Sequence, residues 1–191
     1  MARQAGRPLR ADAQRNRDKI LTTAVRVFAE EGLNAHFERI AREAGVGSGT
    51  LYRNFPTRDS LIEAAYRNEV ARLCDAAPGL LATLPPRDAL RAWMGRFIDY
   101  ATAKLGMADA LRAVIASGGD PYGNSQDLML DTLSSLRQAG VEAGTIRADI
   151  SATDMLAILT GIALASGKPE QRDQAERLLD LALDGLSTGR H

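Results

Sequence analysis

The stretch ERIAREAGVGSGTLYRNFPTRDSLI, residues 38–62, decides the fold. Ile40 and Ala44 lie on one apolar face of a short predicted helix. Gly45 can end that helix, because glycine adopts a left-handed backbone without steric cost. After a short turn that contains glycine, Leu51 continues an apolar face on a second short helix. Two short helices joined by such a turn are typical of a helix-turn-helix, so the stretch predicts this motif.

The second helix of the motif carries polar side chains on its outward face, and such a helix fits the major groove of DNA. Its hydroxyl, amide and guanidinium groups can bond phosphates and base edges. Arg53 is the best candidate base reader, because its guanidinium can make two hydrogen bonds to guanine, worth about 1–3 kcal/mol of discrimination. Gly49 lets the backbone approach the DNA closely. The predicted DNA-contact residues of this helix are Ser48, Gly49, Thr50, Tyr52, Arg53 and Asn54.

The run IAREAGVGSGTLYRNFPTRDSL, with ILTTAVRVFAEEGL upstream, resembles the DNA-binding domain of the tetracycline-repressor (TetR-type) family over about residues 13–70. Asn54 stands where that family commonly has histidine, and Phe37 where it often has a small hydroxyl or apolar residue. The resemblance implies that Tyr52, Phe37 and Arg58 lie at DNA-contact positions, with Arg58 as a phosphate-binding cation. It also implies a transcriptional regulator, expected to be a repressor that a small-molecule effector releases from double-stranded operator DNA.

Composition points to an all-α protein. The chain has 191 residues, of which 5% are aromatic, and no stretch alternates apolar and polar residues as a half-buried strand does. We expect an N-terminal three-helix, homeodomain-like helix-turn-helix domain and a C-terminal helical bundle for ligand binding and dimerisation, with about nine helices.

Residues 1–60 contain 11 Lys/Arg and 7 Asp/Glu, a net +4, which leaves −4 on residues 61–191. A basic front end on an acidic body is typical of a DNA reader with a regulatory domain.

Turn signals divide the chain into four parts. We expect a flexible basic arm over residues 1–11, the DNA-binding domain over 12–56 and a connecting helix over 57–77. Proline and glycine at 76–79, followed by two further prolines, predict the domain boundary. The effector-binding and dimerisation domain then covers 85–191.

Two capping signals predict helix starts. Thr57 precedes the connecting helix as a candidate N-cap. Ser151 with Asp154 resembles a capping box, which opens a helix through Ala165.

The stretches AVIASGGDPY and AGTIRAD resemble the SbtR-like type of C-terminal domain. TetR-like proteins generally dimerise through their last two helices, so the resemblance implies a homodimer through residues 152–165 and 172–186.

Large or pliable side chains in the C-terminal part can line an effector pocket. Core packing explains each of them individually at least as well, so both roles stay open. The candidate effector-binding residues are Trp93, Phe97, Tyr100, Met107, Met129 and Met155.

Enzyme, metal and membrane classes find no support in the sequence. The two histidines have no cysteine or carboxylate cluster beside them, so we expect no catalytic residues, no metal site and no cofactor. The longest apolar run is shorter than the about 20 residues of a membrane span. The N-terminal residues do not resemble a signal peptide, and Cys74 is alone, so we expect a cytoplasmic protein. A helical protein-interaction module and an activator of the same family remain the alternatives.

Overall fold

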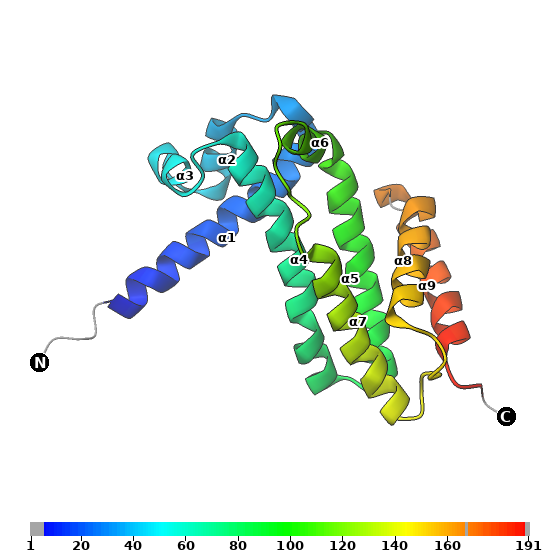
Figure 1. Cartoon of the computed structure of the whole chain (residues 1–191). Helices are drawn as coiled ribbons and strands as arrows, with labels where there is room; N and C mark the ends of the chain where they lie inside the picture. The colour runs from blue at the N-terminus through cyan, green and yellow to red at the C-terminus, as the bar shows by residue number, and fades with distance from the viewer. Residues whose placement is uncertain (1–5, 167, 190–191) are drawn as a thin grey trace, which may run out of the picture. The chain divides into compact units, whose positions relative to one another are not determined.

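The computed structural model describes residues 6–166 and 168–189. Over these residues the chain forms nine α-helices, two short 3-10 helices and no β-strand, which confirms the all-α prediction (Figure 1). In chain order the elements are α1 (Gly6–Glu31), η1 (Gly32–Asn34), α2 (Phe37–Ala44), α3 (Ser48–Asn54), α4 (Arg58–Thr83), α5 (Pro86–Gly106), α6 (Ala108–Ala116), α7 (Ser125–Glu142), α8 (Ala152–Ser166), η2 (Pro169–Gln171) and α9 (Arg172–Leu186).

The described chain divides into two compact units. Unit 1 holds the described residues up to Asn68 together with Gly106–Tyr122. Unit 2 holds Glu69–Leu105 together with the described residues from Gly123 onward. The helix-turn-helix elements therefore share a unit with α6, which lies far from them in sequence.

Helix α4 does not end where the sequence predicts. The sequence predicts a connecting helix over 57–77, whereas α4 continues to Thr83 with Pro78 inside it. Ala77 and Leu80 are buried on one face of this extension, while Pro78 is exposed. Burial of the apolar face outweighs the hydrogen bond that a proline removes from a helix. The domain boundary predicted at these residues stays a prediction.

Helix α1 begins earlier than predicted. The sequence predicts a flexible arm up to residue 11, but α1 starts at Gly6, so the backbone of residues 6–11 is helical. Pro8 lies in the first turn, where backbone N–H groups have no partner within the helix, and its missing N–H therefore interrupts nothing. Residues 1–5 of the predicted arm lie outside the described part of the chain.

Unit 1 has a core built from the apolar faces that the sequence predicts. Helix α1 packs against α2, and α2 packs against α3. Phe28, Ile40 and Leu51 are fully buried between these helices. Gly45 ends α2 with a left-handed φ of 68°, and its N–H donates to the carbonyl groups of the last turn. This confirms the predicted turn, which fixes the direction in which α3 leaves α2.

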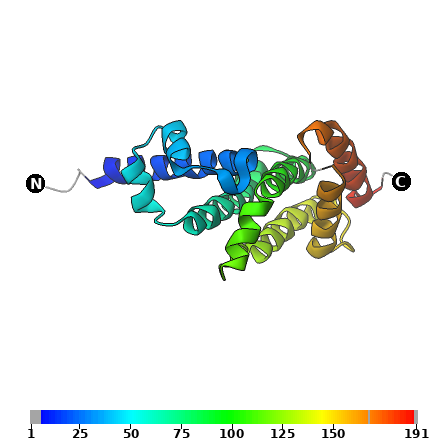
Figure 2. The same ribbon diagram turned by 90° about the horizontal axis from the view of Figure 1, so that it is seen from above.

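Unit 2 contains the last two helices side by side, α8 against α9, with α7 packed on α8 (Figure 2). The predicted capping box opens α8. The backbone N–H of Asp154 donates to Ser151 Oγ at 3.1 Å, and the backbone N–H of Ser151 donates to Asp154 Oδ2 at 3.1 Å. Trp93 is buried in the core of this unit, where its indole N–H donates to the Leu73 carbonyl oxygen at 2.9 Å.

Candidate nucleic-acid interface

Helix α3 has one buried side and one exposed side. Leu51 is the buried residue of the helix, and Phe55 caps its C-terminus with a ring that is 2% exposed. The residues of the opposite face are exposed, with the exception of the half-buried Thr50, and are Ser48, Gly49, Tyr52, Arg53 and Asn54. All six predicted contact residues of α3 are thus at least partly accessible, while Leu51 and Phe55 anchor the helix in the core.

Tyr52 is supported from α2. Its ring packs against Phe37 at a tilt of 34° with the centroids 5.2 Å apart, and its hydroxyl donates to Glu38 Oε1 at 3.3 Å. Partial desolvation of the phenol raises the pKa of Tyr52, and the negative charge of Glu38 raises it further. Tyr52 therefore keeps its proton at neutral pH and remains a hydrogen-bond donor. Phe37 acts here as the platform that holds Tyr52.

Asn54 uses part of its hydrogen-bonding capacity within α3. Its side-chain amide donates to the Thr50 carbonyl oxygen at 2.7 Å, which closes the last turn of the helix. One amide hydrogen and the amide oxygen are left for another partner. Asn54 can therefore both donate to and accept from a ligand on this face.

Arg58 is held by its own unit. Its guanidinium donates to the Ala35 carbonyl oxygen at 2.5 Å and lies over the Phe28 ring, 5.7 Å from the centroid. Its Nε is buried without a hydrogen-bond partner. These contacts attach the start of α4 to the loop before α2. The phosphate contact predicted for Arg58 stays a prediction, and the structure adds a positioning role to it.

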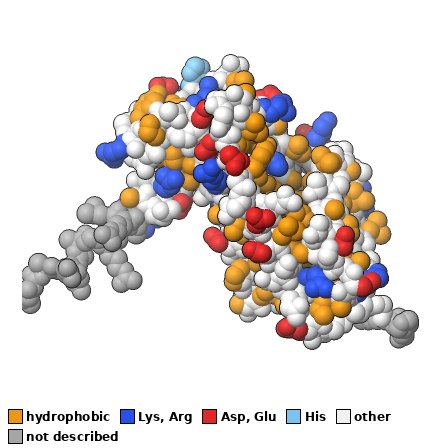
Figure 3. Space-filling model, in the orientation of Figure 1, with side chains coloured by type: hydrophobic (Ala, Val, Ile, Leu, Met, Phe, Trp, Pro, Cys, Tyr) orange, Lys and Arg blue, Asp and Glu red, His pale blue; other side chains and the backbone are white. Residues whose placement is uncertain are grey.

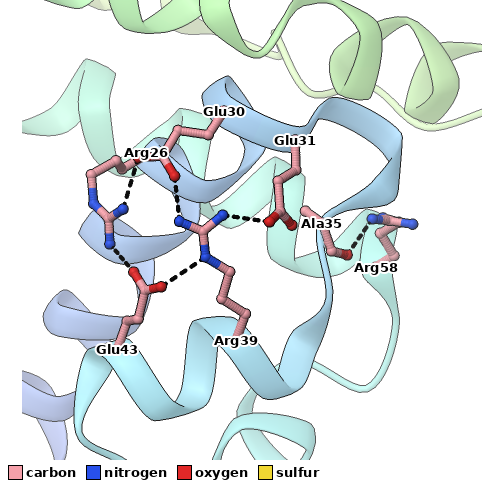
Figure 4. A network of polar contacts seen from close by, with 7 residues as sticks. All are labelled: Arg26, Glu30, Glu31, Ala35, Arg39, Glu43 and Arg58. Carbon is pink, nitrogen blue, oxygen red and sulfur yellow. Dashed lines mark hydrogen bonds and ion pairs between the residues drawn. The ribbon is translucent and has the colours of Figure 1, made fainter.

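An ion-pair network joins α1 to α2 (Figure 4). Arg39 lies at its centre and bonds Glu43 at 2.7 Å, Glu31 at 2.5 Å and Glu30. Arg26 bonds Glu30 at 2.8 Å and also Glu43. The hydrogen bonds from Arg26 and then from Arg39 lower the pKa of Glu43 to about 2. Both arginines are engaged within the protein, so neither is free to read DNA.

The remaining cations of unit 1 are few. On the face seen in Figure 3, acidic and basic side chains are interspersed, in keeping with this internal pairing. Arg17 lies over the Phe55 ring, 4.7 Å from its centroid. Of the described unit 1 side chains, the exposed cations without an acidic partner are Lys19, Arg42 and Arg53. Arg53 is the one on α3, which places a free guanidinium on the face that the sequence singles out.

The six candidate effector-binding residues are all buried, and they do not belong to one unit. Five lie in unit 2, whereas Met107 is in unit 1. The rings of Trp93 and Phe97 are 6.0 Å apart, and those of Phe97 and Tyr100 are 5.7 Å apart. These side chains form part of the packed core, and the effector-binding role predicted for all six stays a prediction.

Unit 2 also has a hollow of about 280 Å³ that none of the six residues lines. It lies between α5, the end of α8 and the start of α9. Arg172 and Asp99, which both line it, form an ion pair, and Ser166 is buried. Its lining residues are Ile98, Asp99, Thr102, Ser166, Lys168 and Arg172.

The last two helices carry apolar side chains on an exposed side. Leu159 is buried in α8 and Leu179 in α9, whereas Leu164 is 74% exposed and Leu181 is 68% exposed. Among all the described helices, α8 and α9 included, none is long and apolar enough to cross a membrane. The described residues also contain no group of three or more His, Cys, Asp or Glu arranged to hold a metal ion. Cys74 is half-buried, which raises the pKa of its thiol.

Comparison with known proteins gives the family. Residues 20–65 match the model described as bacterial regulatory proteins of the tetR family. Residues 85–188, more than half of the chain, match the model described as the C-terminal domain of SbtR-like transcriptional regulators. A segment of 54 residues is 46% identical to an HTH-type transcriptional regulator of Staphylococcus aureus strain USA300. That segment spans 28% of this chain and 29% of the length of the curated relative.

Two solved structures are similar over almost the whole chain. A TetR transcriptional regulator from Streptomyces coelicolor is 74% identical, with a TM-score of 0.89 over 91% of this chain and 99% of that one. A TetR transcription regulatory protein from Mycobacterium vanbaalenii is 38% identical, with a TM-score of 0.78 over 95% of this chain and 100% of that one. The chain therefore belongs to the TetR family of bacterial transcriptional regulators, with a C-terminal domain of the SbtR-like type.

Proposed function

We propose that this regulator is a ligand-responsive repressor that binds double-stranded operator DNA as a homodimer, with α3 of each copy in a major groove. The observation that carries the proposal is the exposed polar face of α3, on which Arg53 has no acidic partner among the described residues. Arg53 reads guanine through two hydrogen bonds. Ser48, Thr50 and Tyr52 donate to phosphates or base edges, while Gly49 permits close approach of the backbone.

The supporting contacts of this face come from α2 and α4. Phe37 holds the Tyr52 ring, so the phenol reaches the phosphate from a fixed position. Asn54 adds one donor and one acceptor at the end of α3. Arg58 approaches a phosphate at the start of α4, where the helix N-terminus favours an anion. It does so with the terminal nitrogen that does not bond Ala35.

The dimer in this proposal forms through α8 and α9. Leu164 and Leu181 expose large apolar surfaces on these helices, and a second copy covers such surfaces with favourable free energy. One α3 reads too few bases for a unique address in a genome. A dimer places two reading helices on half-sites about 34 Å apart, which lengthens the recognised sequence.

The effector in this proposal binds unit 2 among Trp93, Phe97, Tyr100, Met129 and Met155. These side chains are buried. An effector therefore binds a conformer in which they have moved apart, which the pliable methionines permit. Repression ends if that conformer holds DNA poorly, because a ligand shifts an equilibrium only through its different affinity for the two states. Trp93 is the only tryptophan of the chain, so its fluorescence reports binding there.

The test is binding of the purified protein to the DNA upstream of its own gene and to a pool of genomic fragments. Arg53→Ala should weaken operator binding by about 1–3 kcal/mol. Tyr52→Phe should cost about 1 kcal/mol through the lost hydrogen bond. Arg96→Ala is the matched control, because Arg96 is exposed on α5 in unit 2. It should leave affinity unchanged.

The outcomes separate repressor from alternatives. Saturable binding that weakens steeply with salt and in the α3 variants supports the proposal. If the protein is a folded dimer but binds no fragment at low salt, the result refutes DNA readout and supports a protein-interaction module. Transcription in vitro from the bound promoter then distinguishes repression from activation.

A further inference from the structure

Glu38 is an acidic residue at the edge of the proposed DNA-binding face. It is the second residue of α2, it is exposed, and its carboxylate accepts a hydrogen bond from the Tyr52 hydroxyl at 3.3 Å. Tyr52 is in turn proposed to donate to a DNA phosphate. The hydroxyl that Glu38 binds in the free protein is therefore the one that the DNA requires.

Glu38 differs from its acidic neighbours in that no arginine in the described part of the chain is paired with it. Glu30, Glu31 and Glu43 all bond arginines of the α1–α2 network, so their charges are neutralised locally. Glu38 has the Tyr52 hydroxyl as its partner and no cation within 4.0 Å among the described residues. Its negative charge is thus uncompensated on the side of the unit that meets a polyanion.

We propose that Glu38 acts as an electrostatic brake on DNA binding. An ionised carboxylate only accepts hydrogen bonds, so it cannot bond a phosphate and repels it instead. When DNA binds, a phosphate oxygen replaces the Glu38 carboxylate as the acceptor of the hydrogen bond from the Tyr52 hydroxyl. Glu38 therefore weakens every complex in which Tyr52 meets a phosphate, and operator contacts such as those of Arg53 must overcome this repulsion.

This inference rests on the proposed DNA contact of α3 and adds a residue that limits it. Free DNA of unrelated sequence offers the same phosphates without the base contacts of Arg53. The brake therefore weakens binding to such DNA by the same factor as binding to the operator. The complex with unrelated DNA is the weaker one, so it then forms only at a higher concentration of protein. Like-charge repulsion of this kind lowers the occupancy of unrelated DNA, while the ratio of the two affinities stays unchanged.

The experiment measures the affinity of the full-length dimer for two probes. The probes are the fragment upstream of its own gene and a duplex of scrambled sequence with the same length. Like charges about 5 Å apart in a water-like dielectric change an equilibrium constant about fourfold. Glu38→Gln and Glu38→Ala should both tighten binding to both probes by about fourfold at low salt. Alanine excludes the explanation that the new glutamine amide merely bonds a phosphate.

Two controls isolate the local effect. Glu142→Gln removes the same charge from an exposed position on α7 in unit 2, so it reports any effect of net charge alone. Combining Glu38→Gln with Tyr52→Phe tests the route, because a brake that competes for the Tyr52 hydroxyl loses part of its effect when that hydroxyl is absent.

The results decide between this inference and the proposed function. A gain in both Glu38 variants, larger than in Glu142→Gln, supports the brake. Equal affinities of Glu38→Gln and Glu142→Gln overturn it, while wild-type binding leaves the DNA-reader proposal standing. Weaker operator binding with unchanged scrambled-probe binding also overturns it, because Glu38 then accepts from a base amino group such as cytosine N4. Absence of wild-type binding to either probe overturns both.

Discussion

Leu51→Ala tests how α3 is held in position. The helix has seven residues, too few to be stable alone in water, and Leu51 is its buried residue. The Leu51 side chain is fully buried. Truncation of a buried leucine to alanine costs about 2–5 kcal/mol, because transfer free energy is lost and a cavity remains. We expect a loss of about 3 kcal/mol, which is a large fraction of the about 5–15 kcal/mol that stabilises a typical domain.

Equilibrium unfolding in urea measures this loss. With a slope of about 1–3 kcal/mol per molar urea, the midpoint should fall by about 1–3 M. Far-UV circular dichroism reports all helices, whereas fluorescence of Trp93 reports unit 2 alone. We expect the dichroism transition to begin at lower urea while the fluorescence transition moves less. Protein concentration is kept constant, since dimer formation contributes to stability.

Leu33→Ala is the control in the same unit, because Leu33 is 49% exposed in η1. It should change stability by less than about 0.5 kcal/mol. If Leu51→Ala is as stable as Leu33→Ala, α3 is not held through its buried leucine. DNA affinity of Leu51→Ala, measured well below its unfolding midpoint, should also fall, because a displaced α3 loses its contacts together.

Three further predictions concern packing, pH and assembly. Gly140→Ala should destabilise unit 2 by about 1–3 kcal/mol, since the new Cβ would lie 2.4 Å from Ile146 Cγ1. Gly79→Ala meets nothing within 4 Å and should instead add about 0.5–1 kcal/mol, so paired thermal melts check both. The folded pKa of Glu43, about 2, is below its ordinary 4.5, so its stabilising contribution is complete above about pH 4.5 and is lost as the pH falls toward 2. An acid titration followed by circular dichroism should show a smaller change over that window in Glu43→Gln, and equal curves would contradict this. Leu164→Glu should give a folded monomer in sedimentation experiments, because a charge replaces a 74% exposed leucine on the proposed interface; a persistent dimer would place the interface elsewhere.

The features that the sequence predicts correctly are the local ones. Gly45 ends α2 because its own backbone conformation suffices to do so. Ser151 and Asp154 satisfy each other's backbone groups within one turn, without help from distant residues. Thr57 likewise accepts from the backbone N–H of Ser60 at 3.1 Å as α4 begins. Each signal acts over at most four residues, so the printed order of residues contains it fully.

The features that the sequence does not reveal depend on tertiary packing. Pro78 stands inside α4 because the buried side of that helix continues past it. Met107 shares a unit with the helix-turn-helix and not with Trp93, which spacing along the chain cannot indicate. The hydrogen bond between Tyr52 and Glu38 joins residues fourteen positions apart on different helices. Helical periodicity predicts neither the unit of Met107 nor the Tyr52–Glu38 hydrogen bond, because both depend on tertiary packing.

The same distinction changes what the basic N-terminal part means for DNA binding. The first 60 residues contain 11 Lys/Arg, yet the arginines of the α1–α2 network are paired with carboxylates. A count of basic residues therefore overstates the positive charge available to phosphates. Each phosphate contact adds about 0.9 to the slope of log affinity against log salt. The measured slope should follow the few unpaired cations, Arg53 and Arg42 among them, and not the composition. The ion pairs of Arg26 and Arg39 join α1 to α2, the helices that support α3. These two charges therefore position the reading helix and do not attract DNA phosphates.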